Sequence, residues 1–384
     1  MTTTPAAYAW EATDDAIAKR YGVPLEQILR FDLNTAPQPP SLAAEVLARG
    51  AFRPHLAEYP PSDYRALVDA AAGAYGVRRE EVLVAAGADE ALDLVAKAFL
   101  PAGGTSVVPI PTYAMYRVVT EQRRANVVAV PRRAAAEGWA LDLDATAAAA
   151  GRADVVWLCS PNNPTALAEP DGAIEALLAR LEADGARAGT RPPVVVLDEA
   201  YAEFTGRTLV PLIGRHPNLI VVRTASKAYA LAGLRVGFAV AAAGTIGALA
   251  PFRPPASVST VSAAVVTEVL RDPATMRACV AEVELARGRL RADLHAAGWD
   301  AGPSVTNFVL VDFGSPAGAA RVAEGLLRRG IVPRTFGGGP PLAGCLRFTV
   351  RDRAGNDALV AAARELAGTA GPVAARASVA GPVR

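Results

Sequence analysis

Runs of consecutive apolar residues recur through the middle of the chain, and segments with helical spacing separate them. Clear examples are "VVWLC" at residues 155–159, "VVVLD" at 194–198 and "LIVVRT" at 219–224. A helix is expected at 171–184, and Leu92, Val95 and Phe99 repeat at helical spacing after the strand-like "EVLV". Continuous apolar strands that alternate with helices are typical of a parallel sheet covered on both faces. The pattern therefore predicts an α/β fold with a largely parallel sheet.

The hydrophobic pattern changes after about residue 255. One long helix is expected at roughly 261–298, then a strand at "TNFVLVDF", a helix, and short strands at "GIVPRTF" and "CLRFTV". At the other end, residues 1–40 contain a short helix near 14–21 and the Pro-rich "NTAPQPP". We therefore expect an N-terminal arm (1–40), a large domain (41–255), a smaller α+β domain (256–370) and a tail (371–384). The tail is rich in Ala and Gly, and disorder is expected there.

Polar residues stand at the ends of three of the apolar runs. Asn162–Asn163 follow the first run, Asp198 ends the second, and Ser226–Lys227 follow the third. Parallel strands point the same way, so the three groups are expected to meet at one edge of the sheet. Ligands bind outside the carboxyl ends of such strands. The sequence thus predicts a ligand site at this edge.

Lys227 is one of only three lysines in a chain with thirty-six arginines. A lysine amine can condense with an aldehyde or carry protons when its pKa is lowered, and an arginine can do neither. A loop lysine is usually a solvated charge, and this is the interpretation for Lys19 and Lys97. Asp198 ends an apolar strand, where a carboxylate needs a partner. A cationic ring nitrogen would supply one, and a structural salt bridge or a helix cap is the alternative.

Other groups near these two suit a flat, phosphorylated ligand. Thr224, Ser226 and Arg235 offer hydroxyls and a guanidinium to a phosphate. "GADE" at 87–90 places backbone N–H groups at a helix N-terminus, although most such turns bind nothing.

Three further side chains fit the ring of such a ligand. Tyr113 can lie against a planar ring, and Asn163 and Tyr201 can each hydrogen-bond a ring oxygen. An amine, a carboxylate, a phosphate cradle and a stacking aromatic together describe a site for pyridoxal 5′-phosphate (PLP).

Composition excludes several other classes. The formal net charge of +1 predicts no binding to nucleic acid or lipid through bulk charge. No apolar run reaches the roughly 18–20 residues of a membrane span, and the N-terminus lacks a secretory signal pattern. The three cysteines and three histidines are scattered along the chain, so no metal site is expected. The same pattern of cysteines predicts a reducing compartment, the cytoplasm. With so few histidines, Lys, Tyr, a carboxylate or a cofactor must carry proton transfer.

From Phe31 to Val350 the sequence resembles the fold-type-I PLP-dependent aminotransferases of class I/II, and within them the histidinol-phosphate aminotransferases. The resemblance implies PLP transferase fold type I, with a seven-stranded, mostly parallel sheet in a large domain and a smaller α+β C-terminal domain. It also implies the exchange of an amino group between an amino acid or amino-alcohol phosphate and a 2-oxo acid. The matching motifs are "YP" (59–60), "GADEALDLVAKAFL", "PTYAMY", "CSPNNPT", "LDEAYAEF", "RTASKAYALAGLRVGF", "TNF" and "GCLRFTV".

The resemblance further implies roles for individual residues. Lys227 would bond to the aldehyde of PLP and move the substrate proton, while Asp198 keeps the ring nitrogen protonated and Tyr113 stacks on the ring. Tyr59 would reach the phosphate in the neighbouring subunit of a homodimer. The other implied cofactor contacts are Ala88 and Asp89 through their N–H groups, Asn163 and Tyr201 at the ring oxygen O3′, and Thr224, Ser226 and Arg235 at the phosphate. The implied substrate contacts are Arg347, Arg334 and Asn34.

The sequence departs from the family pattern at three places. The arm reads "LNTAPQPP", without an acidic residue and a second Asn that the family has, and "YAWEATDDAIAKRYGV" does not look like its substrate-phosphate tyrosine segment. Ala166 replaces the Gly of "NPTG", and we expect it to be tolerated with a negative φ. The first two changes lie where substrate specificity is built. Transamination of aromatic amino acids, threonine-phosphate decarboxylation and amino-acid oxidation on the same scaffold therefore remain alternatives. A non-catalytic binding module would be expected to lack Lys227 or Asp198.

Overall fold

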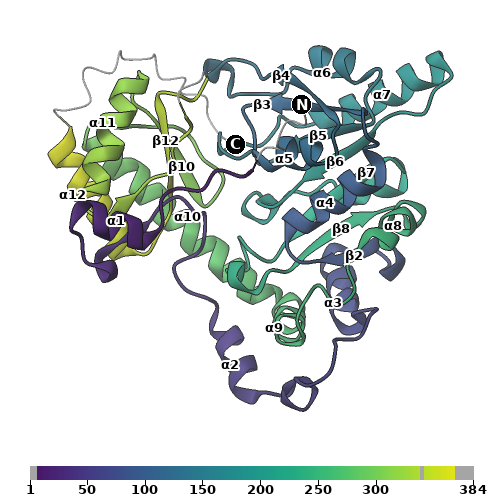
Figure 1. Ribbon diagram of the computed structural model, residues 1–384, viewed down its shortest axis with the longest axis horizontal. Helices are drawn as coiled ribbons and strands as arrows, with labels where there is room; N and C mark the ends of the chain where they lie inside the picture. Colours follow the sequence, from purple (N-terminus) through teal and green to yellow (C-terminus); the bar gives the residue numbers. More distant parts are fainter. Residues whose placement is uncertain (1–6, 338–340, 368–384) are drawn as a thin grey trace.

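A seven-stranded sheet forms the centre of the larger part of the molecule (Figure 1). The computed structural model describes residues 7–337 and 341–367. All neighbouring strands are parallel except β8, which runs antiparallel to both β2 and β7. The prediction of a largely parallel sheet is confirmed. The strand order is β2 (Val82–Ala85), β8 (Gly237–Ala241), β7 (Leu219–Thr224), β6 (Val194–Asp198), β5 (Val155–Cys159), β3 (Thr105–Ile110) and β4 (Asn126–Pro131).

Helices cover both faces of this sheet, and alternate strand residues pack under each layer. In β6, Val195 and Leu197 belong to one apolar core, while Val196 belongs to the other, because successive strand residues point to opposite faces. The first core includes α3 (Arg65–Tyr75), α6 (Leu143–Ala150), α7 (Ala173–Ala188) and α9 (Thr260–Arg271). The second includes α4 (Ala88–Phe99), α5 (Met115–Gln122) and α8 (Ala243–Leu249). The continuous apolar runs of the sequence are therefore strands buried on both sides.

A smaller unit lies beside the sheet and has its own apolar core. It contains an antiparallel sheet in the order β12, β10, β9. The N-terminal segment packs into it, since β1 pairs in parallel with β11 and the buried Phe31 joins the core. In this unit α1 contacts α11, where Tyr21 Oη donates to Glu324 at 2.7 Å. Its elements are α1 (Asp14–Tyr21), β1 (Leu29–Arg30), α10 (Pro273–Ala296), β9 (Asp300–Ala301), β10 (Phe308–Asp312), α11 (Pro316–Leu327), β11 (Ile331–Val332), β12 (Cys345–Thr349) and α12 (Arg353–Leu366).

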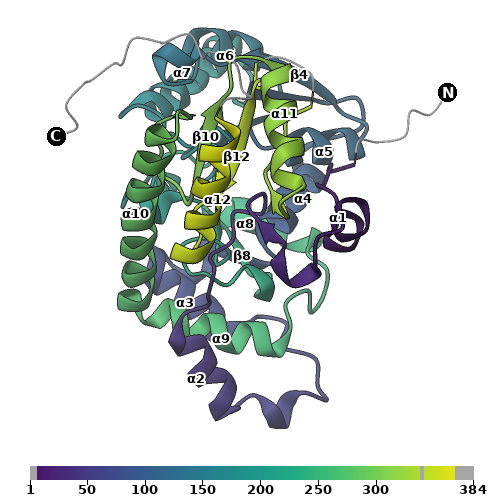
Figure 2. The same ribbon diagram turned by 90° about the vertical axis from the view of Figure 1, so that its left-hand side faces the viewer.

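The single helix expected at 261–298 is wrong, because the structure has two helices there. Asp272 caps the second helix by accepting from the N–H of Ala274, and Pro273 is its first residue. Proline is favoured at that position because it needs no hydrogen-bond partner there. The break separates α9, which packs on α2 (Ser41–Arg49) and α3, from the long α10 that runs to the smaller unit (Figure 2).

The domain boundaries predicted from the sequence stay predictions. The packing of α9 into the core of the large sheet favours a boundary near Asp272 rather than at residue 256. The expected tail at 371–384 lies outside the described residues. In the part of the chain that is described, no helix is both long and apolar enough to cross a membrane.

Candidate active site

A cavity of about 430 Å³ lies at the carboxyl end of the large sheet. All the site residues predicted from the sequence line this cavity, with the exception of Tyr59. Tyr59 lies in the loop between α2 and α3 and is 90% exposed. The structure thus brings together the groups that follow β5, β6 and β7, as the parallel strands predicted. The lining includes Asn34, Ala88, Asp89, Tyr113, Asn163, Asp198, Tyr201, Thr224, Ser226, Lys227, Arg235, Arg334 and Arg347.

Asp198 is the last residue of β6 and is almost fully buried. Its Oδ2 accepts a 2.8 Å hydrogen bond from Tyr116 Oη, and Oδ1 accepts from the Ala200 N–H at 3.0 Å. Burial raises the pKa of Asp198 to about 6, and these two hydrogen bonds oppose that rise. No salt bridge to Asp198 occurs among the described residues. A cation bound in the cavity would therefore find a carboxylate whose charge the protein only partly stabilises.

Lys227 follows β7 and lies in the same cavity. Asp198 lies opposite Val222 of β7 in the strand register. Lys227 comes a few residues after Val222, and so lies just past Asp198 at the same end of the sheet. The Nζ of Lys227 donates to the backbone oxygen of Asn34 at 3.1 Å and to that of Leu33 at 3.5 Å. Burial and, to a smaller extent, the positive charge of Arg347 together lower the pKa of Lys227 to about 8. Roughly a tenth of this amine is therefore uncharged at pH 7.

An anion cradle lies between the end of β7 and the start of α4. Thr224 Oγ1 donates to Ser226 Oγ at 2.9 Å, and the guanidinium of Arg235 is 3.5 Å from that same oxygen. Gly87 precedes α4 with φ +88°, and a Cβ there would lie 2.4 Å from Arg235 Nη2. Only glycine leaves room for the guanidinium against this turn. Hydroxyls, a guanidinium and the unpartnered N–H groups of a helix N-terminus suit a phosphate.

Two tyrosines face the cavity from opposite elements. Tyr113 Oη donates to Asp89 Oδ1 at 3.0 Å, and Tyr201 Oη accepts from Asn34 Nδ2 at 3.0 Å. Burial raises the pKa of both phenols above the ordinary value, so both stay protonated across the physiological range. The O–H of Tyr201 therefore remains for a ligand in the cavity, whereas that of Tyr113 is donated to Asp89.

Arg334 and Arg347 stand side by side because their backbones pair. The N–H of each donates to the carbonyl of the other, at 3.0 and 3.1 Å. Arg347 is buried, and its two terminal nitrogens donate to Asn163 Oδ1 and to the Asp32 carbonyl, while its Nε has no partner. The thirteen-residue spacing in the sequence thus becomes a pair of guanidiniums on one cavity wall.

Sequence reasoning missed two aromatic residues of the arm. Tyr8 and Trp10 line the cavity, and their rings lie 4.8 Å apart. The Tyr8 ring also lies 6.0 Å from that of Tyr113. The segment "YAWE" does not look like the substrate-binding segment of the family. The available signal was the close spacing of two aromatic residues, Tyr8 and Trp10, near the start of the arm.

The tolerance expected at Ala166 depended on a negative φ, and that condition is not met. Its φ is +64°, in the left-handed region that glycine favours, and its side chain is fully buried. The turn is held by the N–H of Ala166 donating to the Asn162 carbonyl, and by the Val305 N–H donating to the carbonyl of Ala166. These contacts with neighbouring elements fix the strained backbone.

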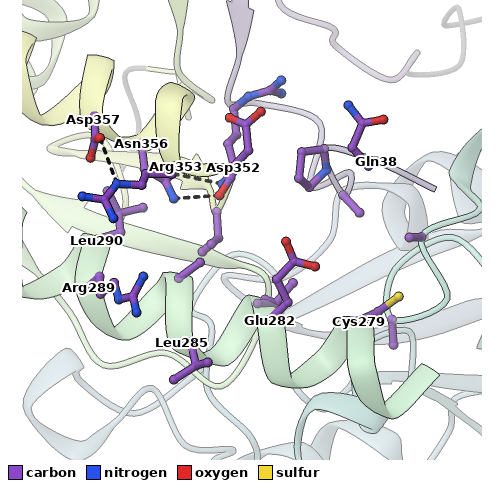
Figure 3. Close-up of a pocket in the computed structure, with 18 of the residues that line it drawn as sticks. Gln38, Cys279, Glu282, Leu285, Arg289, Leu290, Asp352, Arg353, Asn356 and Asp357 are labelled. Atoms are coloured by element: carbon purple, nitrogen blue, oxygen red, sulfur yellow. Dashed lines mark hydrogen bonds and ion pairs between the residues drawn. The ribbon is translucent and has the colours of Figure 1, made fainter. Parts of the chain in front are cut away.

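A second cavity, of about 410 Å³, adjoins Lys227 from another side. It lies between α10, the start of α12 and residues 36–38, and it includes Cys279 and Glu282 (Figure 3). Residues 33–35 line the first cavity and residues 36–38 line the second. The arm therefore passes between the two cavities at Lys227.

A partly buried lysine, a buried carboxylate and an anion cradle at one edge of an α/β sheet are typical of a cofactor-dependent enzyme of the transferase type. The sequence matches the model of the family described as aminotransferase class I and II over residues 28–362. The chain belongs to that family. The predictions of a class I/II aminotransferase and of its fold type are confirmed.

Several relatives are similar over almost the whole chain. Histidinol-phosphate aminotransferase of Roseiflexus castenholzii is 34% identical, covering 92% of this chain and 93% of the relative. The enzyme of that name from Thermococcus gammatolerans is 38% identical, covering 82% and 83%. The crystal structure of histidinol-phosphate aminotransferase from Sinorhizobium meliloti in complex with pyridoxal-5′-phosphate is 26% identical, with a TM-score of 0.84 over 94% of this chain and 96% of that one.

Proposed function

We propose that this aminotransferase binds PLP in the cavity at Lys227 and exchanges an amino group between an amine donor and a 2-oxo acid. The observation that carries the proposal is that Lys227 and Asp198 line one cavity with pKa values moved toward each other, to about 8 and about 6. Burial produces both shifts. It makes the amine nucleophilic and leaves the carboxylate in need of a cation.

The residues present fit PLP. Thr224, Ser226, Arg235 and the start of α4 suit its phosphate, and the close approach of Arg235 to Gly87 forms that cradle. Asp198 suits its ring nitrogen, with Tyr116 holding the carboxylate in place. Asn163 and Tyr201 suit its ring oxygen. When bound, PLP withdraws electrons from the donor's α-carbon and so allows that carbon to lose a proton.

The protein's own groups then have distinct tasks. Lys227 would hold the aldehyde carbon of the cofactor in the resting enzyme. When a donor takes its place, the freed amine would remove the proton from the donor's α-carbon and deliver it to the former aldehyde carbon. Arg347 holds the anionic end of the substrate through its fork of nitrogens. Tyr113 packs against the ring, and the arm residues shield the site from water.

Two donor classes have support. The relatives named histidinol-phosphate aminotransferase favour an amino-alcohol phosphate, for which Arg347 and Arg334 offer two adjacent guanidiniums. The ring group of Tyr8, Trp10 and Tyr113 favours a flat side chain. An aromatic amino acid is therefore the second candidate, with Arg347 binding its carboxylate.

The active unit is proposed to be a homodimer in the cytoplasm. Tyr59 is 90% exposed and Leu56 is 57% exposed on the loop between α2 and α3, so both side chains are accessible to a second subunit. A second subunit would cover this loop and bring Tyr59 to the phosphate cradle of its neighbour. A Tyr59→Ala subunit mixed with a Lys227→Ala subunit should recover part of the lost activity, because one site in the mixed dimer has both residues. No recovery in dimers shown to be mixed would contradict this role.

The decisive test of the cofactor is borohydride trapping. Protein incubated with PLP should become yellow, and reduction should fix the cofactor to the peptide that contains Lys227, as read by mass spectrometry. In a separate sample that has not been reduced, incubation with histidinol phosphate, Phe, Tyr, Arg or threonine phosphate should convert the bound cofactor to pyridoxamine phosphate. Release of carbon dioxide, or consumption of oxygen, would contradict transamination.

A further inference from the structure

The arm segment Tyr8–Glu11 is fixed to the wall of the cavity through Arg334 and the residue that follows it. Arg334 Nη1 donates to the Ala9 carbonyl at 2.8 Å and lies 3.5 Å from Glu11 Oε1. The same Glu11 oxygen accepts from the N–H and the Oγ1 of Thr335, both at 2.8 Å. Glu11 and Arg334 are 17% and 14% exposed, so water screens this pair only in part.

These contacts use one side of the Arg334 guanidinium. Among the residues that the structure describes, only Nη1 has hydrogen-bond partners, and the Tyr8 ring lies against the guanidinium at 5.3 Å. Arg334 nevertheless lines the cavity, whereas Glu11 does not. The Nε and Nη2 groups therefore remain as a two-pronged donor for a ligand, with the carboxylate on the far side. A guanidinium held in this way loses less conformational entropy when it binds an anion.

We propose that Glu11 is a positioning residue for substrate binding, which holds Arg334 with its free nitrogens toward the distal anion of a phosphorylated amine. The proposal rests on the proposed function, because it concerns the far end of the donor in that same cavity. Tyr8 and Trp10 are carried by the same segment, so Glu11 also places the aromatic wall. The contact between Glu11 and Arg334 joins positions 323 residues apart in the sequence.

The hydrogen bonds separate two possible effects of Glu11. If it acts by geometry, a neutral side chain of the same shape should still work, because Gln offers an oxygen to both donors of Thr335. If instead its charge opposes a second anion, removal of that charge should improve the binding of a phosphate. If geometry matters, Glu11→Gln should bind a phosphorylated donor normally and Glu11→Ala should bind it more weakly. If charge matters, both variants should bind it more tightly.

The experiment compares histidinol phosphate with histidinol, which lacks only the phosphate, as donors for the PLP-loaded enzyme. Unmodified enzyme should prefer the phosphorylated donor in kcat/KM. Glu11→Ala should raise KM for histidinol phosphate about tenfold, leave its kcat within about twofold, and leave KM for histidinol within about twofold. Glu11→Gln should stay close to the unmodified enzyme. Asp14→Ala is the matched control, since Asp14 pairs with Arg30 in the same arm and neither residue lines the cavity.

Other results overturn the inference in identifiable ways. An equal loss for both donors in Glu11→Ala would mean that Glu11 only stabilises the arm. A gain for histidinol phosphate in both Glu11 variants would mean that its charge excludes the phosphate. If the enzyme transfers amino groups to 2-oxo acids but does not prefer phosphorylated donors over unphosphorylated ones, this inference is overturned and the proposed function stands. Failure with every amine of the panel would overturn the proposed function itself.

Discussion

Lys227 Nζ donates to the backbone carbonyl of Asn34 at 3.1 Å, which ties the candidate nucleophile at the end of β7 to the N-terminal arm. Asn34 also donates through Nδ2 to Tyr201 Oη, and its carbonyl accepts from Asn307 of the smaller unit. The lysine therefore sits where the large sheet, the arm and the smaller unit meet. This position explains its burial, and burial is the main cause of its lowered pKa.

Replacement of Lys227 should separate cofactor binding from turnover. Lys227→Ala should retain PLP without a covalent bond and lose transamination by several orders of magnitude, because neither of the other two lysines lines the cavity. Absorbance spectra and borohydride trapping measure the first property, and a coupled amino-transfer assay measures the second. Lys97→Ala is the control, since Lys97 pairs with Asp93 on α4 outside the cavity. Substantial turnover by Lys227→Ala would refute the assigned role.

The rate at which the cofactor-free protein captures PLP should depend on pH. Only the uncharged amine attacks an aldehyde, and the pKa of Lys227 is about 8. Roughly a tenth of the amine is uncharged at pH 7, and the rate should rise through pH 8 and level off above it. Stopped-flow absorbance from pH 6 to 9.5 measures this. A rate still rising in proportion to hydroxide near pH 9.5 would indicate an ordinary exposed lysine.

Asp198→Asn should impair catalysis and change how stability depends on pH. Turnover should fall by several orders of magnitude, because a neutral amide cannot keep a ring nitrogen protonated. In the cofactor-free protein, the pKa of Asp198 lies above its unfolded value, so the native state binds more protons between about pH 4 and 6. The contribution of Asp198 to the free energy of unfolding is therefore present at low pH and is lost as the pH rises through 6.

Urea unfolding of cofactor-free protein tests this second effect. The free energy of unfolding of Asp198→Asn relative to the unmodified protein should increase between pH 4 and 7, by up to about 3 kcal/mol for a shift of this size. Tyr116→Phe removes a hydrogen bond that stabilises the charged carboxylate, so it should destabilise the protein most above pH 6. A pH-independent difference for Asp198→Asn would contradict the raised pKa.

Arg334→Ala should weaken phosphorylated donors selectively. A charged hydrogen bond to a phosphate contributes about 1.5–3 kcal/mol, so KM for histidinol phosphate should rise roughly 10- to 150-fold. Unphosphorylated donors should change little. Arg328→Ala is a control of the same residue type, because Arg328 pairs with Glu324 on the surface. Equal losses for both kinds of donor would show that Arg334 is structural.

Substitutions at Ala166 should reveal the strain at its backbone. Ala166→Gly relieves the left-handed conformation, which costs about 1–2 kcal/mol, but it removes a buried methyl group worth about 0.8 kcal/mol. Its net effect on the free energy of unfolding should be within about 1 kcal/mol of zero. Ala166→Val adds a β-branched side chain at φ +64° in a fully buried position. It should destabilise by more than about 2 kcal/mol, and urea unfolding compares the two.

The strands, and the edge of the sheet at which the cavity lies, could be predicted from the sequence because short segments of the chain are enough to indicate them. An apolar run such as "LIVVRT" fixes a strand by its own composition, and the polar residue after it must emerge at the strand end. Because the strands are parallel, Asp198 and Lys227 could be placed at the same edge of the sheet before any contact between them was known. The break between α9 and α10 was also encoded locally, by Asp272 and Pro273, but the apolar spacing on both sides concealed it.

The arm could not be predicted in this way, because its position depends on contacts between distant parts of the chain. Nothing near Glu11 indicates that its carboxylate binds Thr335, or that Tyr8 lies against Arg334. The positive φ of Ala166 likewise follows from its contacts with neighbouring elements rather than from the preference of alanine. The fold and the position of the cavity at the carboxyl ends of the strands follow from the sequence, because periodicity and strand direction are properties of short segments. The cavity wall formed by Tyr8, Trp10 and Arg334 follows only from the packing of the chain, because its contacts join residues hundreds of positions apart.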